Sequence, residues 1–195
     1  MVIIFDIGGV ILKADHKITF KTLSNLGVEE SRAKMFFKND DYRDFSRGLI
    51  TGREFYRALV DRHLQCNLSY NDVVDAHNKH IYAIDKDVLR VVGSLNNKII
   101  FLTDTNEWQN KREKELVDLA RYSDAFFRSN EIGMLKIDST CFPYVISKLK
   151  EQPDNILLID DSIEKIDEAR KNKIRTIHFT DVQDLLKSLK NINLL

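Results

Sequence analysis

Four short segments of the sequence carry the side chains whose types and spacing could do chemistry. They are Asp6 with Gly8, Thr103 to Asn106, Gly133 to Lys136, and Asp160 to Ser162. Clustered carboxylates can bind a hard cation, and a single carboxylate can act as a nucleophile. A hydroxyl and an ammonium group can bind an anion such as phosphate. If the elements beside these segments are neighbours in the fold, the segments converge on one site.

The first segment follows the apolar run from Val2 to Phe5. A run this short and rich in branched residues predicts a buried parallel strand. Open α/β sheets bind their ligands at the carboxyl ends of such strands. Gly8 and Gly9 would let the backbone approach a ligand closely, because they have no Cβ. We therefore expect Asp6 at the mouth of a crevice.

From about Asn97 onward, apolar runs alternate with amphipathic ones. The pattern predicts strands over residues 98–102, 125–128, 156–159 and 175–179, and helices over residues 108–120, 139–150, 163–172 and 182–189. Alternation of this kind is typical of an α/β fold, in which helices cover both faces of a parallel sheet.

The segment between the first strand and this alternating region has a different character. It is rich in aromatic, aliphatic and charged residues at helical spacing, as in Glu54, Phe55, Ala58, Leu59 and Arg62. Because no run of comparable quality predicts a strand there, we expect residues 15–85 to form an all-helical domain over the mouth of the sheet. Residues 1–14 and 86–195 would then form the α/β core domain.

Composition narrows the class of protein. A chain of 195 residues with 30 basic and 30 acidic side chains has no overall field that favours nucleic acid or a membrane. Cys66 and Cys141 match no metal-ligand spacing, so reduced thiols are expected. Asp6 interrupts the apolar N-terminal stretch, and no run approaches the ~18 apolar residues of a membrane span. We expect a cytoplasmic protein, and nothing in the sequence favours a monomer over a homodimer.

In their order, spacing and strand context, the four segments resemble those of the haloacid dehalogenase (HAD) superfamily of hydrolases. The resemblance extends over essentially the whole chain. It is closest to the glucose-1-phosphate phosphatase type, whose first motif also lacks a second aspartate. It implies a Rossmann-like, doubly wound parallel sheet with an inserted helical cap. It also implies a Mg2+-dependent phosphatase that hydrolyses a small phosphorylated metabolite, such as a sugar phosphate, through an aspartyl-phosphate intermediate.

The resemblance also assigns roles to residues around the cation. Asp6 would be the nucleophile, and Asp6, the backbone carbonyl of Gly8 and Asp161 would hold Mg2+. Asp160 would be a ligand through water or an outer partner of the metal. The alternative for Asp160 to Ser162 is a helix cap, and we expect Ser162 to contribute to capping in either case.

The phosphate would be bound by the remaining segments. Thr103 would donate a hydrogen bond to the phosphoryl oxygens, and Lys136 would offset their charge and keep Asp6 ionised. Further candidate donors are the amides of Ile7, Gly8 and Asp104. His77 and His80 lie one helical turn apart, but they have no third ligand nearby, so we expect them on a solvated or cap-packing face rather than at a metal.

Three positions depart from the superfamily pattern. Gly8 replaces the aspartate that protonates the leaving group, a loss that typically costs ~10²–10⁴-fold in rate. Ile137 replaces a proline. Lys165 replaces an acid or amide, and if it points inward it would take an outer-shell role or compete with the cation. Asp15 and His16 are candidate substitutes as proton source.

Two alternatives to a phosphatase follow from these departures. The first is a weakly active or inactive member of the superfamily that serves as a binding or regulatory module. The second is a phosphonate or carbon–halogen hydrolase. A phosphomutase fits poorly, because it needs the carboxylate that Gly8 lacks.

Overall fold

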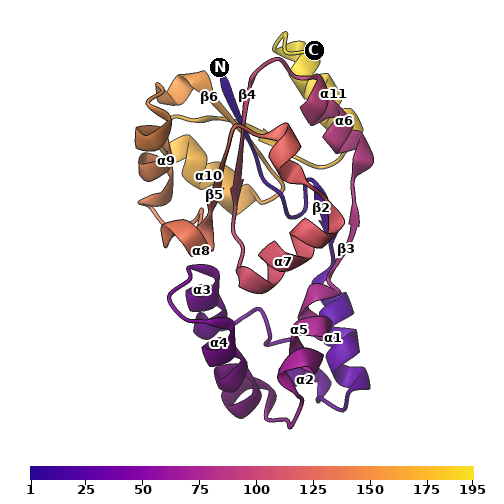
Figure 1. Ribbon diagram of the computed structural model, residues 1–195. Coiled ribbons are helices and arrows are strands. Elements are labelled where there is room, and N and C mark those ends of the chain that lie inside the picture. Colours follow the sequence, from indigo (N-terminus) through magenta and orange to yellow (C-terminus); the bar gives the residue numbers. More distant parts are fainter.

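A five-stranded parallel sheet forms the centre of the molecule (Figure 1). The computed structural model describes all 195 residues. The strand order is β5-β4-β1-β6-β7, with β1 at Val2–Phe5, β4 at Lys98–Thr103, β5 at Ala125–Arg128, β6 at Ile156–Asp160 and β7 at Arg175–His178. The α/β prediction with a doubly wound parallel sheet is therefore confirmed, and the carboxyl ends of all five strands lie at one edge.

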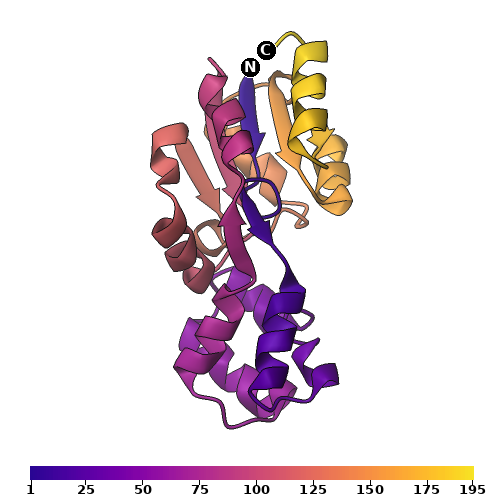
Figure 2. The ribbon, with the colours of Figure 1, turned by 90° about the vertical axis from the view of Figure 1, so that its right-hand side faces the viewer.

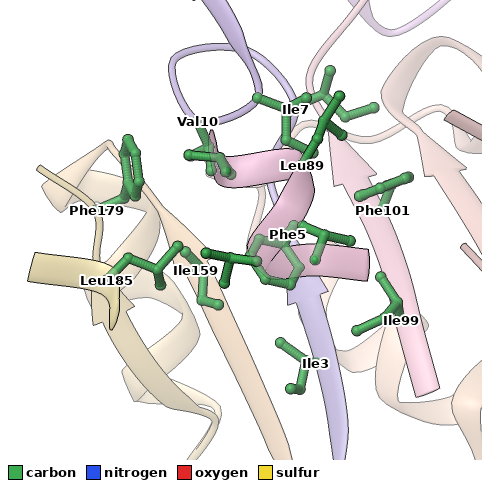
Figure 3. Close-up of a cluster of buried hydrophobic side chains, with 14 of the residues drawn as sticks. Ile3, Phe5, Ile7, Val10, Leu89, Ile99, Phe101, Ile159, Phe179 and Leu185 are labelled. Carbon is green, nitrogen blue, oxygen red and sulfur yellow. The ribbon is translucent and has the colours of Figure 1, made fainter. Parts of the chain in front are cut away.

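The central strand β1 is buried on both faces, which explains its uninterrupted apolar sequence. Side chains alternate across a strand, so Ile3 and Phe5 enter one core while Val2 and Ile4 enter the other. Figure 3 shows the first of these cores, with Phe5 near the middle of the cluster.

Helices cover both faces of the sheet. The first core is closed by α6 at Lys86–Ser94 and α11 at Val182–Asn191, and the second by α9 at Cys141–Leu149 and α10 at Ile163–Lys171. Helix α7 at Glu107–Leu116 ends earlier than predicted, and a 3-10 turn at Leu119–Tyr122 and the short helix α8 at Ser129–Ile132 flank β5. No helix combines the length and apolar character needed to cross a membrane.

Five further helices lie beyond the carboxyl edge of the sheet (Figures 1 and 2). They are α1 at His16–Asn25, α2 at Glu30–Ala33, α3 at Asp40–Ser46, α4 at Gly52–Ala58 and α5 at Tyr70–Asn78, and a π-helical stretch at Leu59–Leu64 continues α4. A third buried cluster holds them together, and Trp108 of α7 joins it. These helices thus pack around an apolar centre of their own beside the sheet edge that carries the predicted site.

A second, two-stranded sheet was not predicted. Strand β2 at Leu12–Ala14 pairs antiparallel with β3 at Ile81–Ile84, so the segment expected to be all-helical ends in a strand. A strand this short is defined by its partner, and here the partner lies on the other side of the whole helical segment. The pair connects the helices to the main sheet at both ends.

Candidate active site

A cavity of about 700 Å³ lies between the carboxyl edge of the main sheet and the helices beyond it. On the sheet side it is lined by Asp6, Gly8, Asp104, Asp161 and Lys165. Four of these residues come directly from the predicted segments. The parallel order of β1, β4 and β6 brings these segments together, as expected for a binding crevice at the strand ends.

Asp6 is fixed at the end of β1. Its N–H donates to the carbonyl of Ile159 at 2.9 Å, and its Oδ1 accepts from the N–H of Ile7 at 2.6 Å. The amide of Ile7 is thereby already engaged within the protein. Burial, together with the carboxylate of Asp160, raises the pKa of Asp6 to about 6, although the ammonium of Lys136 acts to lower it. Without another cation, the carboxyl group is fully ionised only above that pH.

Lys136 lies between two carboxylates with its side chain fully buried. Its Nζ is 2.8 Å from Oδ2 of Asp6, 2.5 Å from Oδ2 of Asp160 and 3.2 Å from the carbonyl of Leu102. Burial alone would lower the pKa of Lys136, but the two carboxylates outweigh it and raise the pKa above its ordinary value. The ammonium has three N–H donors and three protein acceptors. The Lys136 ammonium is therefore placed to neutralise the negative charge of Asp6 and Asp160 inside the protein.

Asp160 directs its carboxylate inward from the end of β6. Its Oδ1 accepts from the N–H of Ser162 at 2.9 Å, whereas the Ser162 side chain makes no capping bond, contrary to the prediction. A capping hydroxyl would have accepted from an amide of the first turn of α10, whereas Asp160 accepts from the amide that precedes this turn. Burial acts to raise the pKa of Asp160, but the ammonium groups of Lys136 and Lys165 lower it below its ordinary value.

Asp161 faces the cavity and lies against the first turn. Gly9 has a φ of +78°, and a Cβ at this position would be 2.0 Å from Oδ2 of Asp161. Only glycine permits both the backbone conformation and the close approach. Burial and the neighbouring Asp160 raise the pKa of Asp161 above its ordinary value.

The three carboxylates fit the requirements of a hard divalent cation. Asp6, Asp160 and Asp161 each offer one oxygen, and these oxygens lie within 4.8 Å of one another. The carbonyl of Gly8 accepts no hydrogen bond from the protein and so is free for a ligand. Burial and, second to it, the negative charge of Asp160 raise the pKa of Asp6 and of Asp161, and Lys136 and Lys165 do not fully offset them. A bound cation would supply the missing charge.

Thr103 and Asp104 follow one another at the end of β4. Together with Ile7 and Gly8 they line a small pocket of about 30 Å³, which shares Gly8 and Asp104 with the main cavity. Oδ1 of Asp104 accepts from the backbone N–H of Lys136 at 2.8 Å. From the sequence only the amide of Asp104 was predicted to contribute, because no local pattern shows that the loop at position 136 lies beside its carboxylate.

Lys165 points into the site from the first turn of α10. Its Nζ lies 3.3 Å from Oδ2 of Asp104 and 3.7 Å from Oδ2 of Asp6. Burial acts to lower the pKa of Lys165, but Asp6 and Asp104 outweigh it and raise the pKa above its ordinary value. The inward orientation considered from the sequence is the one that the structure has, and it gives the site a second ammonium group.

The helices contribute a polar wall to the cavity. The candidate proton sources Asp15 and His16 both line it, together with Lys17, Lys38, Tyr42 and Arg43. Tyr42 and Arg43 were missed from the sequence. Oδ1 of Asp15 accepts from the N–H of Lys17 at 2.9 Å and caps α1. The ring of His16 stacks on Phe37 with 3.9 Å between centroids. Which side chains of a helix face a cavity depends on tertiary packing, so the sequence carries no signal for the missed residues.

A half-buried ion pair ties α3 to the loop that carries Lys136. Arg47 donates from Nε and Nη2 to the two carboxylate oxygens of Asp138, at 2.9 and 2.7 Å. Oδ2 of Asp138 also accepts from the N–H of Leu135 at 2.8 Å. The position of the helices is thus linked to the loop that places the buried ammonium.

His77 and His80 lie outside the carboxylate cluster. Both are buried, and both rings pack against Phe37, so the cap-packing alternative holds and the solvated one is wrong. Burial lowers the pKa of His80 to about 4, which keeps its ring neutral at physiological pH.

Known proteins that are similar to this chain in sequence or in structure include haloacid dehalogenase-like hydrolases. A model of haloacid dehalogenase-like hydrolases matches residues 1–172. A HAD family enzyme from Bacteroides thetaiotaomicron, in complex with magnesium and inorganic phosphate, has a TM-score of 0.83 and 21% identity, covering 92% of this chain and 93% of that one. A predicted HAD-like family hydrolase from Porphyromonas gingivalis has a TM-score of 0.83 and 20% identity, covering 98% and 96% of the two chains.

A curated relative is similar over part of its length. A drimenol cyclase from Aspergillus calidoustus is 21% identical over 97% of this chain, which corresponds to 36% of that protein. The chain therefore spans about a third of the length of this relative.

Proposed function

The chain belongs to the haloacid dehalogenase-like hydrolase family, and from this premise we propose that it is a Mg2+-dependent phosphatase of a small phosphorylated metabolite, such as a sugar phosphate. The observation that carries the proposal is the cluster of Asp6, Asp160 and Asp161 at the strand ends, in which the buried ammonium of Lys136 contacts Asp6 and Asp160. This arrangement combines a nucleophile with the charge balance that phosphoryl transfer needs.

The reaction would proceed in two displacements at Asp6. A carboxylate oxygen of Asp6 attacks phosphorus, the bond to the leaving oxygen breaks, and that oxygen takes a proton from solvent water. Water then attacks the aspartyl-phosphate, releasing inorganic phosphate and restoring the carboxylate. Lys136 keeps Asp6 ionised through its 2.8 Å contact, and Thr103 and the amides of Gly8 and Asp104 donate to the phosphoryl oxygens.

The cation would be held by Asp6, Asp161 and the free carbonyl of Gly8, with Asp160 beside them. When bound, Mg2+ offsets the negative charge of the phosphoryl oxygens and so permits attack by an anion. The structural neighbour from Bacteroides thetaiotaomicron, which is in complex with magnesium and inorganic phosphate, supports magnesium as the cation.

We further propose that residues 15–85 act as a cap domain over a core of residues 1–14 and 86–195. Support comes from the separate apolar cluster of the helices and from the residues that they contribute to the cavity. Such a cap would exclude water from the site and select the substrate. The polar lining of Lys17, Lys38 and Arg43 favours a charged or hydroxylated metabolite over an apolar one.

Hydrolysis of p-nitrophenyl phosphate tests the proposed function. This substrate has a good leaving group, so its hydrolysis does not depend on a general acid. We expect turnover with millimolar Mg2+ and none with EDTA. A folded protein without turnover in either condition would instead favour the binding-module alternative, for which the missing side chain at Gly8 is the specific observation.

The substitution Gly8→Asp is expected to raise the rate. A Cβ at Gly8 meets no atom within 4 Å, and the position lines the cavity, so a carboxyl group fits there. As a general acid it should raise kcat for an alkyl phosphate by about tenfold or more, and should change kcat for p-nitrophenyl phosphate little. Steady-state rates of both substrates are the measurement.

The matched control is Gly8→Asn, which has nearly the same size and no acidic proton. If Asn and Asp give equal rates with the alkyl phosphate, the proton-donor interpretation of position 8 is wrong.

A further inference from the structure

The three N–H donors of Lys136 all have acceptors within the protein. Its ammonium is fully buried and contacts Asp6, Asp160 and the carbonyl of Leu102, and the residue does not line the cavity. A phosphoryl group that enters from the cavity could reach this ammonium only by displacing one of these partners. The charge of Lys136 thus acts on the site from within the protein.

Lys165 has the opposite properties. It lines the cavity, its side chain is 20% exposed, and its Nζ lies 3.3 Å from Asp104 and 3.7 Å from Asp6. Both distances exceed the usual N–H···O range of 2.7–3.2 Å, so the ammonium is held by charge while its donors remain available.

The contact with Asp6 determines what those donors can reach. A phosphorus atom poised for attack lies ~3–3.5 Å from the attacking oxygen. The Lys165 ammonium lies 3.7 Å from Oδ2 of the same carboxylate. It is therefore within hydrogen-bond reach of oxygens on a phosphorus atom poised for that attack.

We propose that Lys165 is a second ammonium group, besides Lys136, that binds the transferred phosphoryl group in this chain, and that its charge also weakens Mg2+ binding at the adjacent carboxylates. The inference deepens the proposed phosphatase function and rests on it. The lysine at position 165 would thus strengthen binding of the anionic substrate and weaken binding of the cation.

Charge balance requires the two effects to have opposite signs. The site contains the carboxylates of Asp6, Asp104, Asp160 and Asp161 and the ammonium groups of Lys136 and Lys165. Removing the charge of Lys165 makes the site one unit more negative. A more negative site attracts a divalent cation more strongly and repels a phosphate dianion.

Equilibrium binding to Lys165→Gln tests the proposal without any turnover. Isothermal titration would measure Mg2+ alone, and then inorganic phosphate at saturating Mg2+. We expect phosphate to bind roughly tenfold more weakly and Mg2+ roughly tenfold more tightly than in the wild type. Lys165→Arg should restore most of the phosphate affinity, because it keeps the charge and the donors.

The control is Lys171→Gln, which changes net charge equally on the same helix. Lys171 is 70% exposed and pairs with Glu168 at the surface, so neither affinity should change. An unchanged phosphate affinity in Lys165→Gln, or a Mg2+ affinity that does not rise, would overturn the inference. If the wild type binds both ions but hydrolyses no phosphate ester, the phosphatase proposal fails while these titrations still decide the role of Lys165.

Discussion

Asp6→Asn is expected to lower kcat for p-nitrophenyl phosphate by at least about 10⁴-fold, because an amide oxygen is too weak a nucleophile to attack phosphorus. The substitution preserves size and shape. Lys136 would keep its 2.5 Å partner Asp160, so the buried ammonium is not left without a counter-ion. The variant should therefore remain folded, with circular dichroism and a cooperative unfolding transition like those of the wild type.

Asp15→Asn provides a control from the same cavity. Asp15 also lines it, but its carboxylate accepts from the N–H of Lys17 at the start of α1, and asparagine caps helices equally well. This variant should retain the wild-type rate with p-nitrophenyl phosphate within a few-fold, because this leaving group needs no general acid. Phosphate release is the assay for both variants. More than one per cent of wild-type turnover in Asp6→Asn would identify another nucleophile.

The core of the fold could be predicted from the sequence because its strands are buried on both faces. Runs such as Val2–Phe5 and Ile156–Asp160 have no polar residue to interrupt them until the carboxylate at the strand end. Parallel pairing then forces those ends to one edge, which is why Asp6, Asp160 and Asp161 were found together. Strand β3 was missed because it depends on pairing with β2 across the helical segment.

The remaining parts of the site depend on contacts that no local pattern encodes. The carboxylate of Asp104 supports the backbone of Lys136, and these residues are distant in sequence. Lys165 reaches Asp6 because α10 begins at Ile163, two residues after Asp161, and side chains in the first turn of a helix tilt towards its N-terminus. The sequence shows that position 165 departs from the family pattern. The direction in which the Lys165 side chain points depends on where α10 begins, which only the structure shows.

Lys136→Met is expected to destabilise the protein by about 3–5 kcal/mol at pH 8 in the absence of metal, because it leaves two buried carboxylates without their closest cation. Methionine fills most of the volume of the lysine side chain, so the loss of charge dominates over the loss of packing. Lys136 is fully buried, and its contacts of 2.8 and 2.5 Å to Asp6 and Asp160 have no replacement nearby except the more distant Lys165.

The pH dependence distinguishes lost charge from lost packing. In the wild type the pKa of Asp160 is lowered, so this acid contributes stability that is present above its unfolded pKa and is lost as pH falls. Without Lys136 that contribution disappears, and the raised pKa of Asp6 should rise further above 6. The loss of unfolding free energy in Lys136→Met should therefore become smaller as the pH falls from 8 to 4, because Asp6 and Asp160 are then protonated more easily.

Urea unfolding at several pH values, with EDTA and then with Mg2+, measures these effects on Lys136→Met. Added Mg2+ should recover part of the lost stability, since it neutralises the same carboxylates. The surface variant Lys171→Met should unfold at nearly the same urea concentration as the wild type at every pH, because an exposed ion pair contributes little to stability. If the deficit of Lys136→Met were equal at pH 4 and pH 8 and insensitive to Mg2+, packing rather than charge would explain it. The buried ammonium would then not be the group that keeps Asp6 ionised.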